Sequence, residues 1–598
     1  MKPVCLLLLV LFFCIVPSVK ASNNVQPFSL SGNFTYELTS NGSVKVREEI
    51  VIRNVTTETY APSFSFDTDG FTPTDITVYE SGLAAKVIQK DEHTYEATFK
   101  RPALGLGANK KVTILFTDES LVTKHGKVVE IKIPRVKNAS QFTSLKTVLR
   151  VSLDDAQTFH IFPQTTGVKN GSFMEYSLDL SKTSESPVTA YLGDVAAFDF
   201  TLNYPFINTS YFPREVTFAI PPDTATQKVY LEQFSDMPES LTYDSDGNWI
   251  GKLTLKAKEQ KTFTVSGTIF VFASAQDDFP AINQEAIKLN TSPQKYWESN
   301  DPQIHELAQR LKTPQAIYDY VVHNLSYDYT KTARPQERLG AKLSLSKKTE
   351  AICMEFTDLF IAIARAAGIP AREVNGFAIS EDSMRPRALG GDVLHSWPEY
   401  YDTVSGQWIQ VDPTWGNTTG GVDYFSHFDL NHITFVIHGA SSTLPQTPGT
   451  YETTDPNSDL IHIEPSAKGV ESETTTPTIA VSPVGFSLWS QTYTVTVENS
   501  SGHALYNIPV SVQADNTNIV TKNIPSILPY SKSSFSINLY PGFFGSKLPA
   551  HLQIESLKET IEIPVSKTAI LIAHLFVLMM PIVLLPIMIY FIAKHAKH

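Results

Sequence analysis

The stretch TEAICMEFTDLFIAIARAAGIPAR, residues 349–372, contains a helical pattern with a single cysteine near its start. Thr349 is a suitable N-cap with acidic residues in the following turn, and Gly368 with Pro370 ends the run. Between these signals, apolar side chains recur at the spacing of one helix face: Phe356, Leu359, Phe360, Ile363 and Ala367. The pattern predicts a helix with Cys353 in its first turn or two.

The position of Cys353 suits a nucleophile. Backbone N–H groups and the partial positive charge at a helix N-terminus stabilise the thiolate, which is the reactive form of cysteine. A nucleophile of this kind also needs a base to manage its proton. The sequence supplies a candidate in His395, which lies in the segment LHSWPEYY at residues 394–401.

Two short segments on either side of the turn DTVSG predict a β-hairpin. The first is 394–401, and the second, QWIQVD at 407–412, partly alternates polar and apolar side chains and ends before a proline. Because antiparallel strands run back on themselves, a histidine near the start of the first and an aspartate at the end of the second can lie side by side. Cys353, His395 and Asp412 are therefore predicted to form a nucleophile, a base and an orienting acid.

Three motifs together resemble those of the transglutaminase-like core domain. They are the helix-borne cysteine followed by ARAAGIPAR at 364–372, then HSWPE at 395–399, and then VDPTW at 411–415. The resemblance extends over residues 302–439 and implies an α+β, papain-like catalytic core with a Cys–His–Asp triad. One departure is Ala351, which stands where the family usually has glycine and which fits ordinary backbone but resists a positive φ.

Aromatic residues near the three motifs are candidates for contacts with substrate. Trp397 and Trp415 are predicted substrate-binding residues that wall an acyl site and shed water, with Trp408 as a third candidate and core packing as the alternative for each. Tyr327 or Tyr329 is a candidate donor to the oxyanion, beside the backbone N–H of the nucleophile.

The segment GGVDYFSHFDLNH, residues 420–432, concentrates carboxylates and histidines. Asp423, His427, Asp429 and His432 are ligand types that suit zinc or calcium in part, but their spacing matches none of the common metal motifs. We therefore predict no metal and no cofactor, and we interpret the segment as a loop that walls the cleft. Calcium dependence stays open.

Two apolar segments predict the compartment. Residues 1–21 resemble a secretory signal peptide that is cut after Ala21. Residues 568–592 carry no formal charge and are long enough to span a bilayer, and the lysines and histidines of 593–598 favour a cytoplasmic C-terminus. We expect a single-pass protein of the cell membrane whose N-terminal body is extracytoplasmic.

Composition restricts the partners and the redox chemistry. The chain of 598 residues has 42% hydrophobic residues and a formal net charge of -13, which favours several solvated domains and argues against a nucleic-acid partner. Of its 3 cysteines, Cys5 and Cys14 lie in the predicted signal peptide. The mature chain then keeps only Cys353, which excludes an intrachain disulfide and a multi-cysteine metal site.

Alternating apolar and polar residues with turn signals predict β-structure before and after the core. Asp301-Pro302 and Thr313-Pro314 mark the starts of two helices that lead into the core. The predicted multidomain fold consists of a signal peptide (1–21), N-terminal β-sandwich modules (22–190 and 191–280), the α+β transglutaminase-like core (295–440), a linker (441–477) whose apolar set around Ile461 can add a strand to a neighbour, a C-terminal β-sandwich (478–565), one transmembrane helix (568–592) and a cytoplasmic tail (593–598).

The triad predicts an enzyme that acts on amide bonds of a protein or peptide substrate through an acyl-enzyme. An amine acceptor would give a cross-linked product, and water would give proteolysis or deamidation. The sequence leaves the acceptor and the substrate open. Two alternatives also stay open: a surface binding or adhesion protein with a vestigial core, and a scaffold for secretion or glycan handling.

Overall fold

The computed structural model describes residues 27–596 except 58–59, 69, 126–127, 137–138, 154–158, 186, 277–283, 332–336, 380–393, 420–421, 427, 454–458, 471–474 and 516. The predicted signal peptide lies outside the described residues, as do the last two residues of the predicted tail. The chain forms two compact units. Unit 1 comprises Met1–Val122, Lys132–Ala156 and Pro163–Val188, and unit 2 comprises Thr123–Ile131, Gln157–Phe162 and Thr189–His598.

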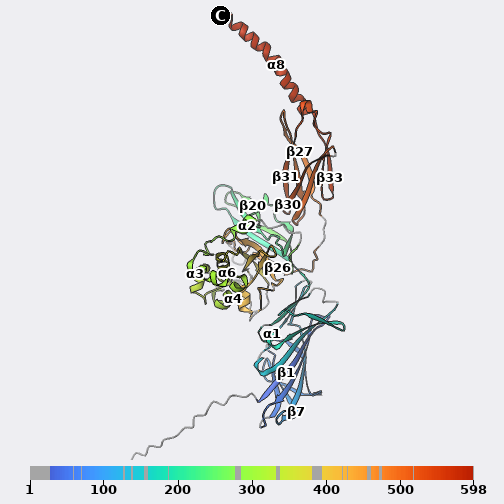
Figure 1. Cartoon of the computed structure of the whole chain (residues 1–598), viewed down its shortest axis with the longest axis vertical. Coiled ribbons are helices and arrows are strands. Elements are labelled where there is room, and N and C mark those ends of the chain that lie inside the picture. Colours follow the sequence, from blue (N-terminus) through green and yellow to red (C-terminus); the bar gives the residue numbers. More distant parts are fainter. Residues whose placement is uncertain are drawn as a thin grey trace, which may run out of the picture. The chain divides into compact units, whose positions relative to one another are not determined.

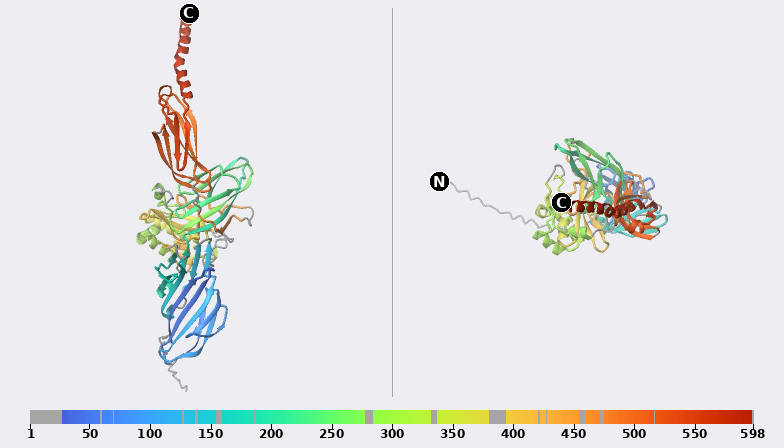
Figure 2. Two further views of the ribbon diagram at one scale, coloured as in Figure 1. Left: turned by 90° about the vertical axis from the view of Figure 1, so that its right-hand side faces the viewer. Right: turned by 90° about the horizontal axis from the view of Figure 1, so that it is seen from above.

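Unit 1 is built from β-strands whose buried and exposed side chains alternate, as in β2 (Val44–Asn54). Its strands are coloured blue to blue-green in Figure 2. The larger sheet has the order β13 (Gly167–Asn170), β14 (Phe173–Asp179), β11 (Phe142–Ser152), β1 (Phe28–Leu38), β2, β8 (Asn109–Asp118), β4 (Pro73–Glu80) and β5 (Leu83–Ala84). The smaller sheet has the order β3 (Tyr60–Asp67), β7 (Thr94–Leu104) and β6 (Lys86–Gln89), and the short helices η1 (Ala139–Gln141) and α1 (Leu180–Glu185) flank β11 and β14.

Unit 2 begins with β-sheets that pack around one apolar cluster, which includes Phe198, Tyr204, Phe218 and Trp249. One sheet has the order β18 (Gln227–Phe234), β21 (Gln260–Phe272), β16 (Val195–Ile207) and β26 (Ile461–Pro465), and another has β17 (Arg214–Ile220), β20 (Trp249–Leu255) and β19 (Ser240–Tyr243). A third has β12 (Phe159–Phe162), β15 (Val188–Leu192), β10 (Val128–Ile133) and β9 (Val122–His125). The pairing of β26 with β16 confirms that the predicted linker adds a strand to a neighbour.

The helical core lies between residues 284 and 438 and surrounds the helix that carries the cysteine. Its helices are α2 (Gln284–Leu289), α3 (Pro302–Leu311), α4 (Pro314–Asn324), α5 (Gly340–Ser346), α6 (Cys353–Ala366) and α7 (Pro413–Thr418), and its antiparallel sheet has the order β24 (Gln407–Gln410), β23 (Leu394–Asp402), β22 (Ala371–Ala378) and β25 (His432–His438). Helices α3 and α4 start where predicted, and the side chains of Asp301 and Thr313 cap them. Figure 1 shows α3, α4 and α6 side by side.

Two amide side chains attach the core sheet to the preceding β-module within unit 2. Gln227 donates to the carbonyl of Thr434 at 2.9 Å and accepts from its N–H at 2.8 Å. Asn248 makes the same pair of bonds with Ile437, at 2.8 and 2.7 Å. Each side chain therefore continues the hydrogen bonding of β25 as a neighbouring strand would, and the buried strand leaves none of these backbone groups unpaired.

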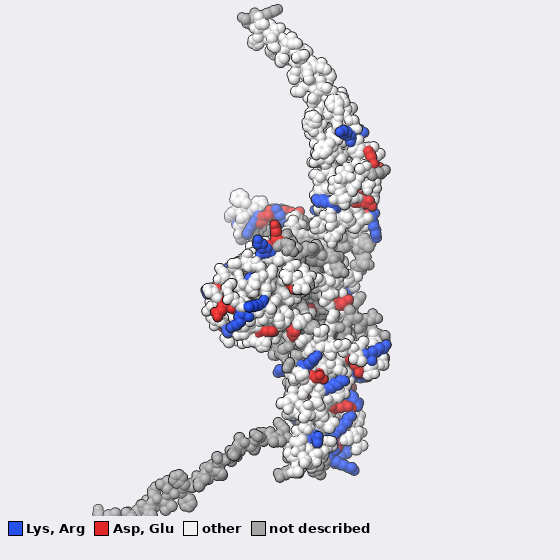
Figure 3. Space-filling view, viewed as in Figure 1, with Lys and Arg blue, Asp and Glu red and all other residues white. Residues whose placement is uncertain are grey.

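The C-terminal part consists of a second sandwich and one long helix. One sheet has the order β27 (Thr478–Phe486), β28 (Gln491–Asn499) and β31 (Ser531–Leu539). The other has the order β30 (Thr517–Ile527), β29 (Leu505–Ala514), β32 (His551–Ser556) and β33 (Glu559–Pro564), and the short helix η4 comprises Phe543–Gly545. Helix α8 (Thr568–His595) is long and apolar enough to cross a membrane, and Figure 3 shows no charged side chain along most of its length. The strand-rich multidomain architecture with a helical core and one apolar C-terminal helix confirms the predicted fold class.

Candidate active site

Cys353 is the first residue of α6, so the thiol lies at the helix N-terminus as predicted. The prediction that Thr349 is the N-cap is wrong, because Ile352 holds that position. The reason is a non-local pairing: Ser326 N–H donates to the Lys348 carbonyl and Asp328 N–H to the Ala351 carbonyl, each at 2.8 Å. This pairing keeps the preceding segment out of the helix.

Glu355 fixes the start of α6. Its carboxylate accepts hydrogen bonds from the N–H groups of Ile352 at 2.9 Å and Leu339 at 3.0 Å, and the side chain is buried. A carboxylate in the first turn also complements the positive end of the helix. The Glu355 carboxylate therefore connects the backbone next to the thiol to the backbone at Leu339.

Ala351 and Tyr327 form an isolated parallel bridge beside the nucleophile. Ala351 is fully buried and is not among the described residues that have a positive φ, so an alanine fits the backbone at this place. Burial first and then the nearby Cys353 raise the pKa of Tyr327 well above its usual range, which keeps its hydroxyl protonated and able to donate. Tyr329 is 49% exposed. An oxyanion role for Tyr327 stays a prediction.

The strand that carries His395 docks directly on the cysteine helix. Thr357 of α6 donates its hydroxyl to the Ser396 carbonyl of β23 at 3.0 Å, and the Ser396 hydroxyl donates to Glu373 at 2.8 Å. In β22, Gly376 pairs with His395. A side chain at position 376 would place its Cβ 1.9 Å from the Ile433 carbonyl oxygen, so only glycine allows β22 to lie this close to β25.

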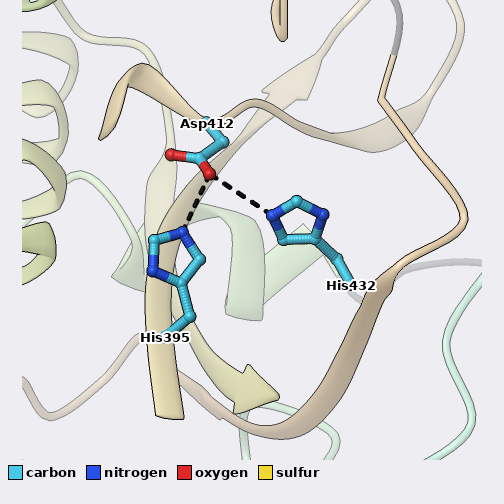
Figure 4. A group of neighbouring side chains, drawn as sticks. All are labelled: His395, Asp412 and His432. Atoms are coloured by element: carbon cyan, nitrogen blue, oxygen red, sulfur yellow. Dashed lines mark hydrogen bonds and ion pairs between the residues drawn. The ribbon is translucent and has the colours of Figure 1, made fainter. Parts of the chain in front are cut away.

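The imidazole of His395 connects the thiol to a carboxylate. Its Nε2 lies 2.8 Å from Asp412 Oδ2, and the thiol of Cys353 is near enough to the ring to raise its pKa, which leaves Nδ1 as the nitrogen available to the thiol. Figure 4 shows Nε2 pointing at the carboxylate. Burial lowers the pKa of His395, but Asp412 and the thiol outweigh that effect and raise it to about 9. The raised pKa of His395 therefore favours an imidazolium beside the sulfur at neutral pH.

Asp412 uses both carboxylate oxygens. It is the N-cap of α7, where Oδ1 accepts from the N–H groups of Thr414 at 2.8 Å and Trp415 at 3.1 Å, while Oδ2 accepts from His395 and from His432. Burial opposes its ionisation, but the charges and hydrogen bonds of the two histidines hold the pKa of this carboxyl well below its usual range. The sequence signal for α7 was available and missed: aspartate followed by proline is an N-cap with proline at the first helical position.

The comparison with protein families bears on these same residues. Residues 300–413 match the model of the transglutaminase-like superfamily, and the matched range includes Cys353, His395 and Asp412. The chain contains a transglutaminase-like domain. This confirms the resemblance predicted from the three motifs. No match was found among the curated protein sequences.

Solved structures show only distant likeness to the chain. A Cytophaga hutchinsonii protein described as a candidate cysteine protease is 17% identical, with a TM-score of 0.28, over 46% of this chain and 98% of its own. An M1 zinc metallopeptidase from Deinococcus radiodurans is 8% identical (TM-score 0.19, over 29% and 43%), and native yeast LTA4 hydrolase is 11% identical (TM-score 0.20, over 29% and 30%). The chain thus spans less than half the length of the last two proteins.

The two predicted substrate-binding tryptophans, Trp397 and Trp415, are fully buried. Trp415 and Trp397 stack on the ring of His395, with centroids 5.3 and 5.7 Å away, and Trp397 also donates to the Gln410 side chain at 2.9 Å. These contacts fix the plane of the imidazole. Contact with a substrate stays a prediction for both tryptophans. The third candidate, Trp408, stacks against Arg372, whose guanidinium carbon lies 4.0 Å from the centre of the indole ring.

The structure describes three of the four residues of the histidine-rich segment that were considered as a metal site, and two of these three meet each other. His432 Nδ1 lies 2.6 Å from Asp429 Oδ1, and its Nε2 lies 3.3 Å from Asp412 Oδ2. Asp423 instead accepts from the N–H groups of a turn, and His427 lies outside the described residues. The structure thus joins Asp429 and His432 to the three predicted catalytic residues.

His395, Asp412 and His432 bring three donor atoms within 4.8 Å of one another, a spacing that a metal ion could also bridge. Hydrogen bonds account for the arrangement without one, because each nitrogen already meets a carboxylate oxygen. A metal on His395 Nε2 would also leave an N–H facing the sulfur, and the ring could not act as a base. The hydrogen bonds to Asp412 therefore suffice to hold the three side chains together.

His432 also lines a cavity of about 480 Å³. Its wall includes Asp429, Trp408 and Gln410, whereas Cys353 is not among its lining residues.

Proposed function

We propose that the chain is a membrane-anchored, extracytoplasmic cysteine enzyme that acts on amide bonds of proteins or peptides. The observation that carries this proposal is the 2.8 Å contact of His395 with Asp412, together with a thiol at a helix N-terminus close enough to His395 to raise its pKa. Helix α8 supports the anchor, and the predicted signal peptide supports the compartment.

The residues give each step a proton donor or acceptor. The thiolate of Cys353 attacks the amide carbonyl carbon, and the resulting oxyanion accepts from the Cys353 N–H and the Tyr327 hydroxyl. As the C–N bond breaks, His395 gives its proton to the leaving amine. An amine or a water then attacks the thioester while His395 takes a proton from it, and the C–S bond breaks to restore the thiol.

The acceptor decides the product. An amine acceptor yields a cross-linked chain, and water yields a cleaved or deamidated one. Asp412 keeps the same task in both cases, because it orients the imidazole and stabilises its protonated form.

The test is the pH dependence of Cys353 alkylation by iodoacetamide in the detergent-solubilised full chain. Rapid labelling well below about pH 8.5, the ordinary pKa of a cysteine, and its loss in His395→Ala would support the proposal. A glutamine-containing peptide with and without a fluorescent primary amine then separates transfer from hydrolysis. Labelling only above that pH would favour the binding or adhesion alternative instead.

A further inference from the structure

His432 sits between two carboxylates. It is the first residue of β25, and both of its ring nitrogens meet an acidic oxygen: Nδ1 meets Asp429 at 2.6 Å and Nε2 meets Asp412 at 3.3 Å. Ionised carboxylates only accept hydrogen bonds, and a neutral imidazole donates from one nitrogen alone. Both contacts are satisfied together only when His432 is an imidazolium.

The surroundings of His432 favour that cation. Burial lowers its pKa, but Asp429 and Asp412 outweigh burial and raise it to about 9. The side chain is fully buried, and its ring lies 4.4 to 4.8 Å from three aromatic rings whose faces or edges line it: Trp397, Trp415 and Phe428.

The cation shares an acceptor with the proposed base. Asp412 Oδ2 accepts from His395 at 2.8 Å and from His432 at 3.3 Å, and Figure 4 shows both rings converging on this one oxygen. A positive charge on one side of a carboxylate weakens the attraction that the carboxylate exerts on a proton at its other side. His432 thus acts on the thiol through Asp412 and His395.

We propose that His432, held by Asp429, is a positioning residue that orients Asp412 toward His395 and limits how tightly His395 holds its proton. This inference rests on the proposed function, since it concerns the same site. It gives the triad two further members on the side away from the thiol, in the order Cys353, His395, Asp412, His432, Asp429.

Titratable groups face His432 from each of the elements that pack against its ring. Strand β23 supplies His395, the residue before α7 supplies Asp412, and the segment before β25 supplies Asp429 together with Tyr424, whose ring centroid lies 6.2 Å away. Among the described residues, the two carboxylates are the only acidic groups in hydrogen-bond contact with its ring.

The experiment measures the pH profile of Cys353 alkylation by iodoacetate in the full chain, in detergent and with a chelator present. The alkaline limb of that profile reports the loss of the His395 proton. In His432→Gln, Asp412 no longer faces a second cation, so the limb should move up by about one pH unit. Asp429→Asn should move it in the same direction by less, because His432 then loses part of its charge.

His438→Gln is the matched control. His438 is the last residue of the same strand, is buried, and hydrogen-bonds Glu373 at 3.2 Å, so its loss disturbs β25 without touching Asp412. This variant should lower the Tm and leave the alkaline limb in place. A folded His432→Gln protein whose limb does not move would overturn the inference.

A second readout separates the inference from the proposed function. The Tm difference between the wild type and His432→Gln should be largest below about pH 6.5 and should shrink as the pH rises through about 9. If this pattern appears while Cys353 never reacts, the enzyme proposal fails and the His432 cation stands. If Cys353 reacts and the Tm difference is independent of pH, the inference fails and the enzyme stands.

Discussion

The 2.8 Å contact between His395 Nε2 and Asp412 Oδ2 joins two pieces of secondary structure as well as two catalytic candidates. His395 belongs to β23, and Asp412 caps α7 with its other oxygen. One carboxylate therefore fixes the imidazole and the entry into the helix that brings Trp415 onto the same imidazole. Changes at position 412 should separate these two tasks.

Asp412→Asn should retain the helix cap and lose the charge. Asparagine caps a helix as well as aspartate does, whereas alanine cannot cap it. Asp412→Ala should therefore be about 1 kcal/mol less stable than Asp412→Asn. Without the anion the proton affinity of His395 falls, and Cys353 alkylation near pH 6 should drop by about tenfold or more. Thermal unfolding and the alkylation rate of the two variants give the two readouts. Equal rates in Asp412→Asn and wild type would remove Asp412 from the triad.

The stability of the core should decline as the pH rises from about 6.5 to 9. His395 and His432 both have pKa values raised to about 9, so the stability that their pairing supplies is complete below the unfolded value of about 6.5 and is lost through about pH 9. Asp412 acts in the opposite range, because its lowered pKa supplies stability above about pH 4 that is lost in stronger acid. Urea unfolding followed by tryptophan fluorescence should show this decline, and a His395→Gln, His432→Gln double variant should flatten it.

Tyr327→Phe tests the oxyanion without disturbing the thiolate. The hydroxyl is protonated and close to the nucleophile, so its removal should lower kcat by about a hundredfold and leave the alkylation of Cys353 nearly unchanged. Tyr329→Phe is the matched control, since its ring packs 4.9 Å from Tyr327 but is half exposed. Comparable kcat values for the two variants would assign the oxyanion contact to another group.

The local parts of the site could be predicted from sequence, because short-range patterns determine them. Apolar spacing placed Cys353 at a helix start, and the two segments around a five-residue turn gave the hairpin that pairs β23 with β24. The N-cap could not be predicted in the same way. It depends on the pairing of Tyr327 with Ala351, which lie 24 positions apart and carry no local signal for each other.

The proposed roles of His432 and Asp429 also depend on tertiary structure. The sequence showed the two residues as neighbours in a segment rich in metal-ligand types. Only the pairing of β25 with β22, which sets His432 opposite Ala378, carries that ring to the carboxylate of Asp412. A spacing of three residues between an acid and a histidine is common, so the sequence could not distinguish a relay from a metal site.

Gly376→Ala should damage the site through close packing. A Cβ there would lie 1.9 Å from the Ile433 oxygen and 2.8 Å from the indole of Trp397, which stacks on His395. Overpacking of this kind costs about 1–3 kcal/mol, and the displaced indole should also slow Cys353 alkylation. Gly485→Ala is the control, because that strand glycine has no atom within 4 Å of its added Cβ. If both variants unfold at the same temperature, the space beside Gly376 is larger than the contacts indicate.

Arg338 is expected to be the most sensitive charged residue of the core. Its guanidinium pairs with Asp358 of α6 and, at 2.9 Å, with Glu373 of β22, and both carboxylates are fully buried. Arg338→Leu removes the cation that two buried carboxylates share behind the helix that carries the thiol, which should cost about 3–5 kcal/mol. Adding Glu373→Gln should restore part of that loss, because it removes one of the two anions. Arg47→Leu, at a pair whose arginine side chain is 53% exposed, should change stability by no more than about 1 kcal/mol. A loss of similar size at positions 338 and 47 in urea unfolding would show that the buried pairs do not hold α6 against the sheet.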